Sequence, residues 1–109
     1  MATVQPRDPV LADFVRTKLT LLRDRFAPQH VILFGSRARG EGRSDSDIDL
    51  IVVSPAFADI KWPLRASEVL LALRLRRAVD VLCYTPEEFE KLRTWAGVVA
   101  TACEEGIWL

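Results

Sequence analysis

Apolar and polar positions along the 109-residue chain follow patterns typical of helices and strands in alternation. Apolar residues recur at helical spacing over residues 9–26, whereas residues 31–34 form a short continuous apolar run typical of a buried strand. The predicted strands are 31–34, 47–53 and 78–84, and the predicted helices are 9–26, 63–76, 86–93 and 95–105. Residues 1–8 are expected to form a flexible lead. The pattern predicts one α/β (α+β) domain with helices packed on a sheet.

The segments between and after these elements carry further expectations. Residues 56–62 are expected to form a loop with exposed apolar character. On the helix 63–76, Leu64 and Leu71 are expected to broaden the packed apolar side, and arginines such as Arg65 to be solvated, with a phosphate or polymer contact as the alternative. The apolar tail 107–109 must dock somewhere, either in the core or on a partner.

Composition narrows the class of protein. Half of the residues are hydrophobic and 28% are charged, so the chain can form a core. Fifteen basic residues match fifteen acidic ones, and this zero net charge gives no support for direct binding of nucleic acid or an anionic membrane. Neither a signal peptide nor an apolar run long enough to span a membrane is visible. Cys83 and Cys103 lie far apart without a C-x-x-C pattern, so we expect two reduced, buried cysteines in a cytoplasmic protein.

Two acids stand at the start of the predicted strand 47–53. Because Asp47 and Asp49 are two residues apart, strand geometry points both side chains to the same face. Like charges this close repel each other, and a Mg²⁺ ion bound by their oxygens would remove the repulsion. Asp80, flanked by valines on the strand 78–84, would be a third carboxylate and would suit a two-metal site. The alternatives are a frayed strand end with both acids in water and an arginine salt bridge for Asp80.

A Gly35-Ser36 turn directly follows the strand 31–34. Glycine lets the backbone turn sharply and approach a ligand closely. If a short helix begins at Arg37, backbone N–H groups at its N-terminus and the Ser36 hydroxyl would hold a phosphate. Arg37 and Arg39 add positive charge and paired donors for phosphate oxygens. The alternative is an ordinary strand–turn–helix with solvated arginines.

The combined pattern is an apolar strand, Gly35-Ser36, ten residues, Asp47-x-Asp49 and then Asp80 on a later strand. This pattern resembles the DNA polymerase β-type nucleotidyltransferase superfamily, and most closely its minimal nucleotidyltransferases, over nearly the whole chain. The resemblance implies a small mixed β-sheet with helices packed on it, the catalytic palm. It also implies that Gly35 and Ser36 bind a nucleoside triphosphate and that Asp47, Asp49 and Asp80 are catalytic and bind two Mg²⁺ ions. No element of the motif is missing, which predicts a competent enzyme.

The reaction expected of such a site is in-line attack of a hydroxyl on the α-phosphorus of ATP, which needs charge neutralisation and alignment. Arg37 or Arg39 is expected to steady the β- and γ-phosphates, and Asp80 is a candidate for accepting the proton of the attacking hydroxyl. Only 25 residues follow the strand 78–84. We therefore expect another protein to contribute recognition of the acceptor.

Minimal nucleotidyltransferases of this kind resemble antitoxins paired with small helical HEPN-type ribonuclease toxins, which they silence by attaching AMP to a tyrosine. The resemblance thus implies a protein adenylyltransferase that acts as an antitoxin on a HEPN-type partner. The alternatives are a non-catalytic binding subunit and a nucleotidyltransferase subunit that acts on a small molecule or nucleic acid. The arginine-rich segment 64–77 supports the last of these. Because so small a palm presents little surface to a nucleobase, we expect poor base selectivity.

Overall fold

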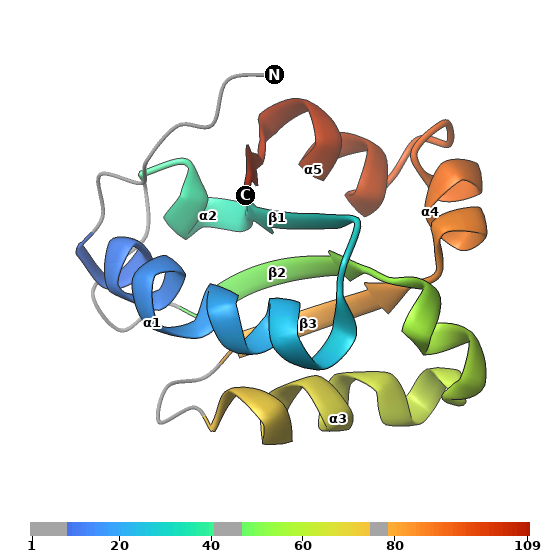
Figure 1. The fold of residues 1–109 in the computed structure, drawn as a ribbon. Coiled ribbons are helices and arrows are strands. Elements are labelled where there is room, and N and C mark those ends of the chain that lie inside the picture. The colour runs from blue at the N-terminus through green and yellow to red at the C-terminus, as the bar shows by residue number, and fades with distance from the viewer. Residues whose placement is uncertain (1–8, 41–46, 75–78) are drawn as a thin grey trace.

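The structure is a computed structural model that describes residues 9–40, 47–74 and 79–109. Its elements are α1 (Pro9–Phe26), β1 (His30–Phe34), α2 (Gly35–Ala38), β2 (Ile48–Val53), the 3₁₀ helix η1 (Pro55–Asp59), α3 (Trp62–Leu73), β3 (Val79–Tyr84), α4 (Pro86–Leu92), α5 (Val98–Glu105) and β4 (Ile107–Trp108). The expected α/β (α+β) fold is confirmed (Figure 1). The predicted lead 1–8 and the end of the predicted helix 63–76 lie outside the described residues.

The four strands form one mixed sheet in the order β3-β2-β1-β4. β2 and β3 are parallel, and β1 is antiparallel to both of its neighbours. Parallel strands need a crossover connection, which η1 and α3 provide between β2 and β3. The register pairs Phe34 with Asp49, and Asp49 with Asp80. Both acids therefore lie at the end of the sheet where β1 finishes and where β2 and β3 begin.

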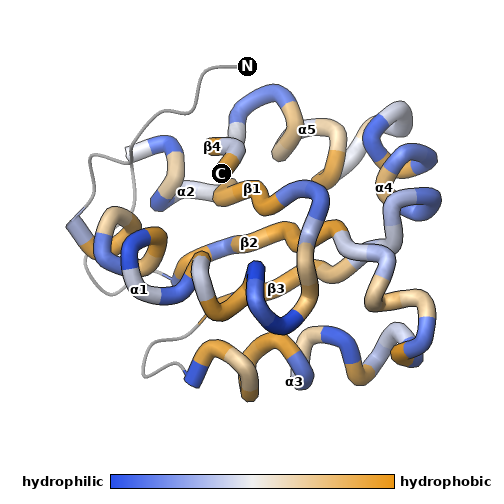
Figure 2. Tube along the Cα trace, viewed as in Figure 1, coloured by the Kyte–Doolittle hydropathy of each residue, from blue (hydrophilic) through white to orange (hydrophobic). Residues whose placement is uncertain are grey.

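The two faces of the sheet carry separate apolar clusters because side chains alternate along each strand. Leu50 and Val52 pack with α1 and α3 on one face, and Ile51 and Val53 pack with α4 and α5 on the other. Figure 1 shows the sheet between α3 on one side and α4 and α5 on the other. The three longer strands are mostly hydrophobic (Figure 2). Asp49, two residues before Ile51, faces the side of α4 and α5.

The expectation that residues 56–62 form an exposed apolar loop is wrong at Phe57. η1 forms there, and Phe57 is fully buried, with its ring centroid 5.2 Å from that of Phe26 in α1. The Ser54 hydroxyl donates to the carbonyl oxygen of Phe26 and accepts from the N–H of Ala56 at 3.1 Å. Contacts with α1, a distant segment of the chain, bury Phe57.

α3 buries Val69 and Leu73, but its buried apolar side is narrower than expected. Leu64 and Leu71 are 55% and 73% exposed, because Val69 and Leu73 occupy the side that faces the sheet. Arg65, expected in solvent, is buried instead. Its Nε donates to a backbone carbonyl oxygen at 2.9 Å and its Nη1 to the Glu88 carboxylate at 2.7 Å. Since Glu88 also forms the capping box of α4 with Thr85, the arginine ties α3 to the start of α4.

The C-terminal residues dock on the sheet of the molecule itself. β4 pairs antiparallel with β1, and the N–H of Leu109 donates to the carbonyl oxygen of Val31 at 2.8 Å. The indole N–H of Trp108 donates to the carbonyl oxygen of Cys103 at 3.1 Å. Of the two open possibilities for the tail, docking within the chain is the one observed. This pairing holds α5, which immediately precedes β4, close to β1.

Two predicted boundaries shift. β2 begins at Ile48, so Asp47 lies just outside the strand. The last helix begins at Val98 and not at Trp95, because Gly97 before it has φ +151°, a backbone conformation that no ordinary helix residue adopts.

Both thiols are free; Cys83 is buried as expected, whereas Cys103 is only partly buried. Burial raises the pKa of Cys83 to about 12, so this side chain is uncharged at neutral pH. Within the described ranges, no helix combines the length and the apolar character needed to cross a membrane.

Replacing Phe57 by alanine should lower the free energy of unfolding by about 3–5 kcal/mol, because a fully buried ring would leave a cavity beside α1. Urea unfolding followed by circular dichroism measures this change. Trp62→Ala is the control: Trp62 belongs to the same connection but is half-exposed, and its loss should cost about 1 kcal/mol. Equal losses in the two variants would contradict the burial of Phe57.

Candidate active site

Three acids lie at one end of the sheet. Asp49 in β2 is half-buried, and its register partner Asp80 in β3 is exposed. Asp47 is exposed and immediately precedes β2. Because register partners on parallel strands are neighbours on the same face, the structure brings Asp49 and Asp80 together from segments 31 positions apart.

Gly35 occupies a position that only glycine fits. Its φ is +82°, and a Cβ added there would lie 2.2 Å from Oδ2 of Asp49 and 3.0 Å from its Cγ. Both the backbone conformation and the missing side chain are therefore needed. The pairing of Phe34 with Asp49 creates this contact, so the carboxylate lies directly against the turn.

The short helix α2 begins at Gly35, two residues earlier than the start considered from sequence. Phe34 before it is extended, and the N–H of Arg39 donates to the carbonyl oxygen of Gly35 at 3.2 Å. Ser36 lies in the first turn and is partly exposed. The first N–H groups of a helix have no partner within the helix. This geometry is compatible with the predicted phosphate binding by Gly35 and Ser36, which stays a prediction.

The two arginines of this segment differ in accessibility. Arg37 is 3% exposed, whereas Arg39 is exposed. Burial raises the pKa of Asp49, and the positive charge of Arg39 partly opposes this rise, so the arginine lies within electrostatic reach of the acids. Arg39 is thus the better placed of the two for a ligand that arrives from solvent. The phosphate-binding roles of both remain predictions.

Electrostatic repulsion links the three acids. The pKa of Asp49 is raised above its ordinary value, first by burial and then by the charges of Asp80 and Asp47, while Arg39 opposes the shift. Carboxylate oxygens are the ligands that Mg²⁺ prefers, and a cation here would offset the repulsion. In the part of the chain that the structure describes, no group of three or more Asp, Glu, His or Cys side chains is arranged to hold a metal ion. The two-ion site therefore stays a prediction, supported by the donor set.

A pocket of about 390 Å³ opens beside Gly35 on the side of α5. It is lined by Phe34, Gly35, Arg39, Gly97, Val98, Thr101, Ala102 and Glu105. None of the site residues expected from sequence lies on α5. Helical spacing places four of the lining residues, Val98, Thr101, Ala102 and Glu105, on one side of α5. Which way this side faces depends on how the C-terminal segment packs.

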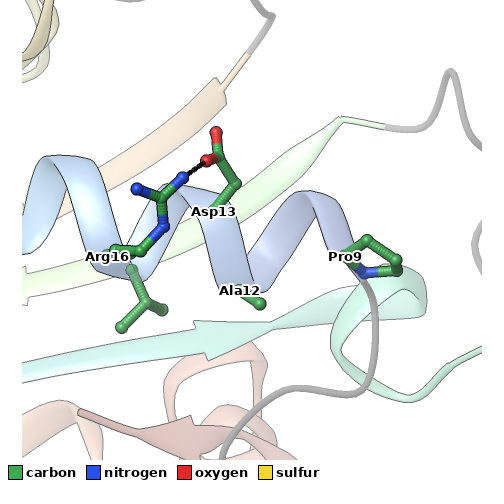
Figure 3. Close-up of a pocket in the computed structure, with 5 residues that line it drawn as sticks. Pro9, Ala12, Asp13 and Arg16 are labelled. Carbon is green, nitrogen blue, oxygen red and sulfur yellow. Dashed lines mark hydrogen bonds and ion pairs between the residues drawn. The ribbon is translucent and has the colours of Figure 1, made fainter.

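A larger pocket of about 610 Å³ lies along α1 (Figure 3). Pro9, Ala12, Asp13, Val15 and Arg16 line it. Its two charged side chains, Asp13 and Arg16, are exposed and form an ion pair with each other. Because α1 packs on the sheet face opposite to Asp49, this pocket is separate from the acids, and we assign it no function.

Comparison with known families gives a match to the nucleotidyltransferase domain over residues 15–109. This chain belongs to that family. The match includes the Gly35-Ser36 turn and all three acids, and the predicted membership of the polymerase β-type nucleotidyltransferases is confirmed. The chain is therefore a nucleotidyltransferase by family.

Individual proteins add detail to this assignment. A "putative protein adenylyltransferase" of Methanocaldococcus jannaschii is 30% identical over 70 residues, which are 60% of this chain and 70% of that protein. The crystal structure of a putative nucleotidyltransferase from Sulfolobus solfataricus is similar to this chain, with a TM-score of 0.54 and 23% sequence identity. The match covers 72% of this chain and 70% of that chain. BolA1 from Arabidopsis thaliana has a TM-score of 0.55 at 16% identity, over 68% of this chain and 93% of that one. The two structural likenesses concern the fold alone.

Gly35→Ala should destabilise this nucleotidyltransferase more than Gly40→Ala does. Both glycines have φ near +80°, so each substitution costs about 1–2 kcal/mol in backbone strain. A Cβ on Gly40 meets nothing within 4 Å, whereas one on Gly35 collides with Asp49, which adds about 1–3 kcal/mol. Urea unfolding of the two variants measures the difference. Equal losses would show that the carboxylate does not lie against the turn.

Asp49→Asn should raise the free energy of unfolding at neutral pH in the presence of EDTA. The pKa of Asp49 is raised in the folded protein, so the folded state holds this proton more tightly than the unfolded chain does. The resulting stabilisation is present at acid pH and is lost as pH rises above the ordinary value of 3.8 through the folded pKa. The advantage of the variant should therefore shrink towards pH 4. Unfolding curves from pH 4 to 8 test this.

Asp24→Asn is the matched control, since Asp24 is exposed on α1, on the other side of the sheet. Its stability should follow that of the unmodified protein across the same pH range. A variant at Asp49 that is less stable than this control at neutral pH would contradict the electrostatic repulsion.

Proposed function

We propose that the protein is a Mg²⁺-dependent protein adenylyltransferase that transfers AMP from ATP to a hydroxyl of a partner protein. We further propose that the partner is a HEPN-type toxin and that the transfer silences it. The contact between Asp49 and Gly35, with Asp80 beside Asp49, carries the proposal. It joins acidic oxygen donors directly to a turn of the kind that binds phosphates.

In the proposed reaction the acceptor oxygen bonds to the α-phosphorus of ATP while the bond from that phosphorus to pyrophosphate breaks. Mg²⁺ bound by Asp47, Asp49 and Asp80 would neutralise phosphate charge and lower the pKa of the acceptor hydroxyl. The turn at Gly35 holds the leaving pyrophosphate. Asp80, exposed on the far side of Asp49 from the turn, is placed to take the acceptor's proton.

Two observations favour a protein as acceptor. The Methanocaldococcus relative bears the name of a protein adenylyltransferase. Trp95 and Leu71 are also 66% and 73% exposed, which leaves apolar surface available to a partner protein. By contrast, Arg65 is buried against Glu88, which removes one of the arginines that supported direct binding of nucleic acid.

The proposal is tested with α-³²P-labelled ATP, Mg²⁺ and a lysate of the host organism. The protein should transfer label to one small protein, with AMP attached to a hydroxyl identified by mass spectrometry. Asp47→Asn combined with Asp49→Asn should reduce this transfer at least about 100-fold, because the charge on the phosphates is no longer neutralised. Asp24→Asn combined with Asp59→Asn removes two exposed acids elsewhere and should leave transfer intact.

The other outcomes separate the alternatives. Label on RNA or on a small molecule would replace the protein acceptor by one of those classes. Silencing of a co-expressed toxin that persists in the Asp47/Asp49 double variant would identify a non-catalytic binding subunit. Full transfer by that variant would overturn the mechanism.

A further inference from the structure

The pocket between α2 and α5 adjoins the acids directly. Gly35 lines this pocket, and the same residue contacts the Asp49 carboxylate. Phe34, another lining residue, is the register partner of Asp49. The pocket also lies on the sheet face of Asp49, because α5 packs on that face. A ligand whose phosphates lie at Gly35 therefore has this cavity next to it.

One stripe of α5 forms the opposite wall. Val98, Thr101, Ala102 and Glu105 follow the i, i+3, i+4, i+7 spacing that places residues on the same side of a helix. Ala102 is buried at the base, while Thr101 and Glu105 are exposed. The wall thus combines an apolar floor with a hydroxyl and a carboxylate at its edge.

This combination matches the chemistry of a nucleoside. A volume of about 390 Å³ lies within the range of sites for small molecules, which are mostly apolar with a few placed polar groups. A nucleobase has flat apolar faces and a polar edge. Arg39, at the same pocket, would face the negative charge of the attached phosphates.

We propose that the nucleoside of the triphosphate occupies this pocket, between Phe34 and α5, and that Thr101 and Glu105 recognise the edge of the base. The inference rests on the proposed nucleotidyl transfer and adds base selection by α5. A carboxylate only accepts hydrogen bonds, so Glu105 favours a base that presents an amino group. Adenine does so at its 6-position, whereas hypoxanthine presents a carbonyl oxygen there. The poor base selectivity expected from the size of the palm is replaced by a preference for ATP over ITP.

The first test measures binding of ATP and ITP by calorimetry with Mg²⁺ present. The unmodified protein should bind ATP roughly 10-fold more tightly than ITP, because a hydrogen bond to a charged group is lost with ITP. Glu105→Gln should bring the ratio close to one, since an amide can donate to the carbonyl of hypoxanthine. Glu104→Gln is the matched control: Glu104 is exposed on the same helix and does not line the pocket, so the preference should persist.

The second test fills the pocket. Val98→Trp should weaken ATP binding about 10-fold or more, because the indole would occupy the space of the base. Binding of tripolyphosphate, which has no nucleoside, should be unchanged. Leu71→Trp, at an exposed site on α3, should change neither.

The results distinguish two kinds of failure. If ATP and tripolyphosphate bind the unmodified protein equally well and Val98→Trp affects neither, the nucleoside does not lie against α5 and the inference falls while phosphate binding stands. If Glu105→Gln still prefers ATP over ITP, Glu105 does not recognise the base. If neither ligand binds in the presence of Mg²⁺, the proposed nucleotidyl transfer fails, and the inference fails with it.

Discussion

The candidate site depends on the close approach of the Asp49 carboxylate to the backbone of Gly35. Strand pairing between β1 and β2 creates it, since the last residue of β1 lies opposite Asp49. Any side chain at position 35 would occupy the space of the carboxylate. The turn predicted to bind phosphate and the acid predicted to bind a cation are therefore in direct contact.

The two faces of the sheet differ in composition: one carries the larger apolar cluster, and the other carries a smaller cluster together with Asp49. One face is covered by α1 and α3 and holds the larger apolar cluster. The other is covered by α4 and α5 around Ile51 and Val53, while Asp49 on the same face is only half-buried. Burial, and then the charges of the neighbouring carboxylates, raise the pKa of Asp49, an unfavourable arrangement for the isolated fold. Groups perturbed in this way are typical of functional sites, where a ligand compensates for the repulsion.

The C-terminal segment forms the side of the pocket that lies opposite Phe34 and Gly35. β4 pairs with β1 at the edge of the sheet, and α5, which precedes it, contacts β1. Gly106, between them, fits tightly, since a Cβ there would lie 2.4 Å from the carbonyl oxygen of Ala102. This packing holds α5 beside the end of β1. Residues of α5 thereby form one side of the pocket beside Gly35.

Residue patterns along the chain were enough to predict the longer helices and strands and the chemical type of the site. Apolar runs and helical spacing located the longer strands and helices, because these patterns depend on local backbone geometry. The order and spacing of Gly35, Asp47, Asp49 and Asp80 predicted the nucleotidyltransferase family, which the family match confirms. Tertiary structure alone decided the burial of Phe57, Arg65 and Arg37 and the exposure of Leu71, since each depends on which distant element covers it. It also decided the pocket wall on α5, because the pairing of β4 with β1 brings together segments more than 70 residues apart.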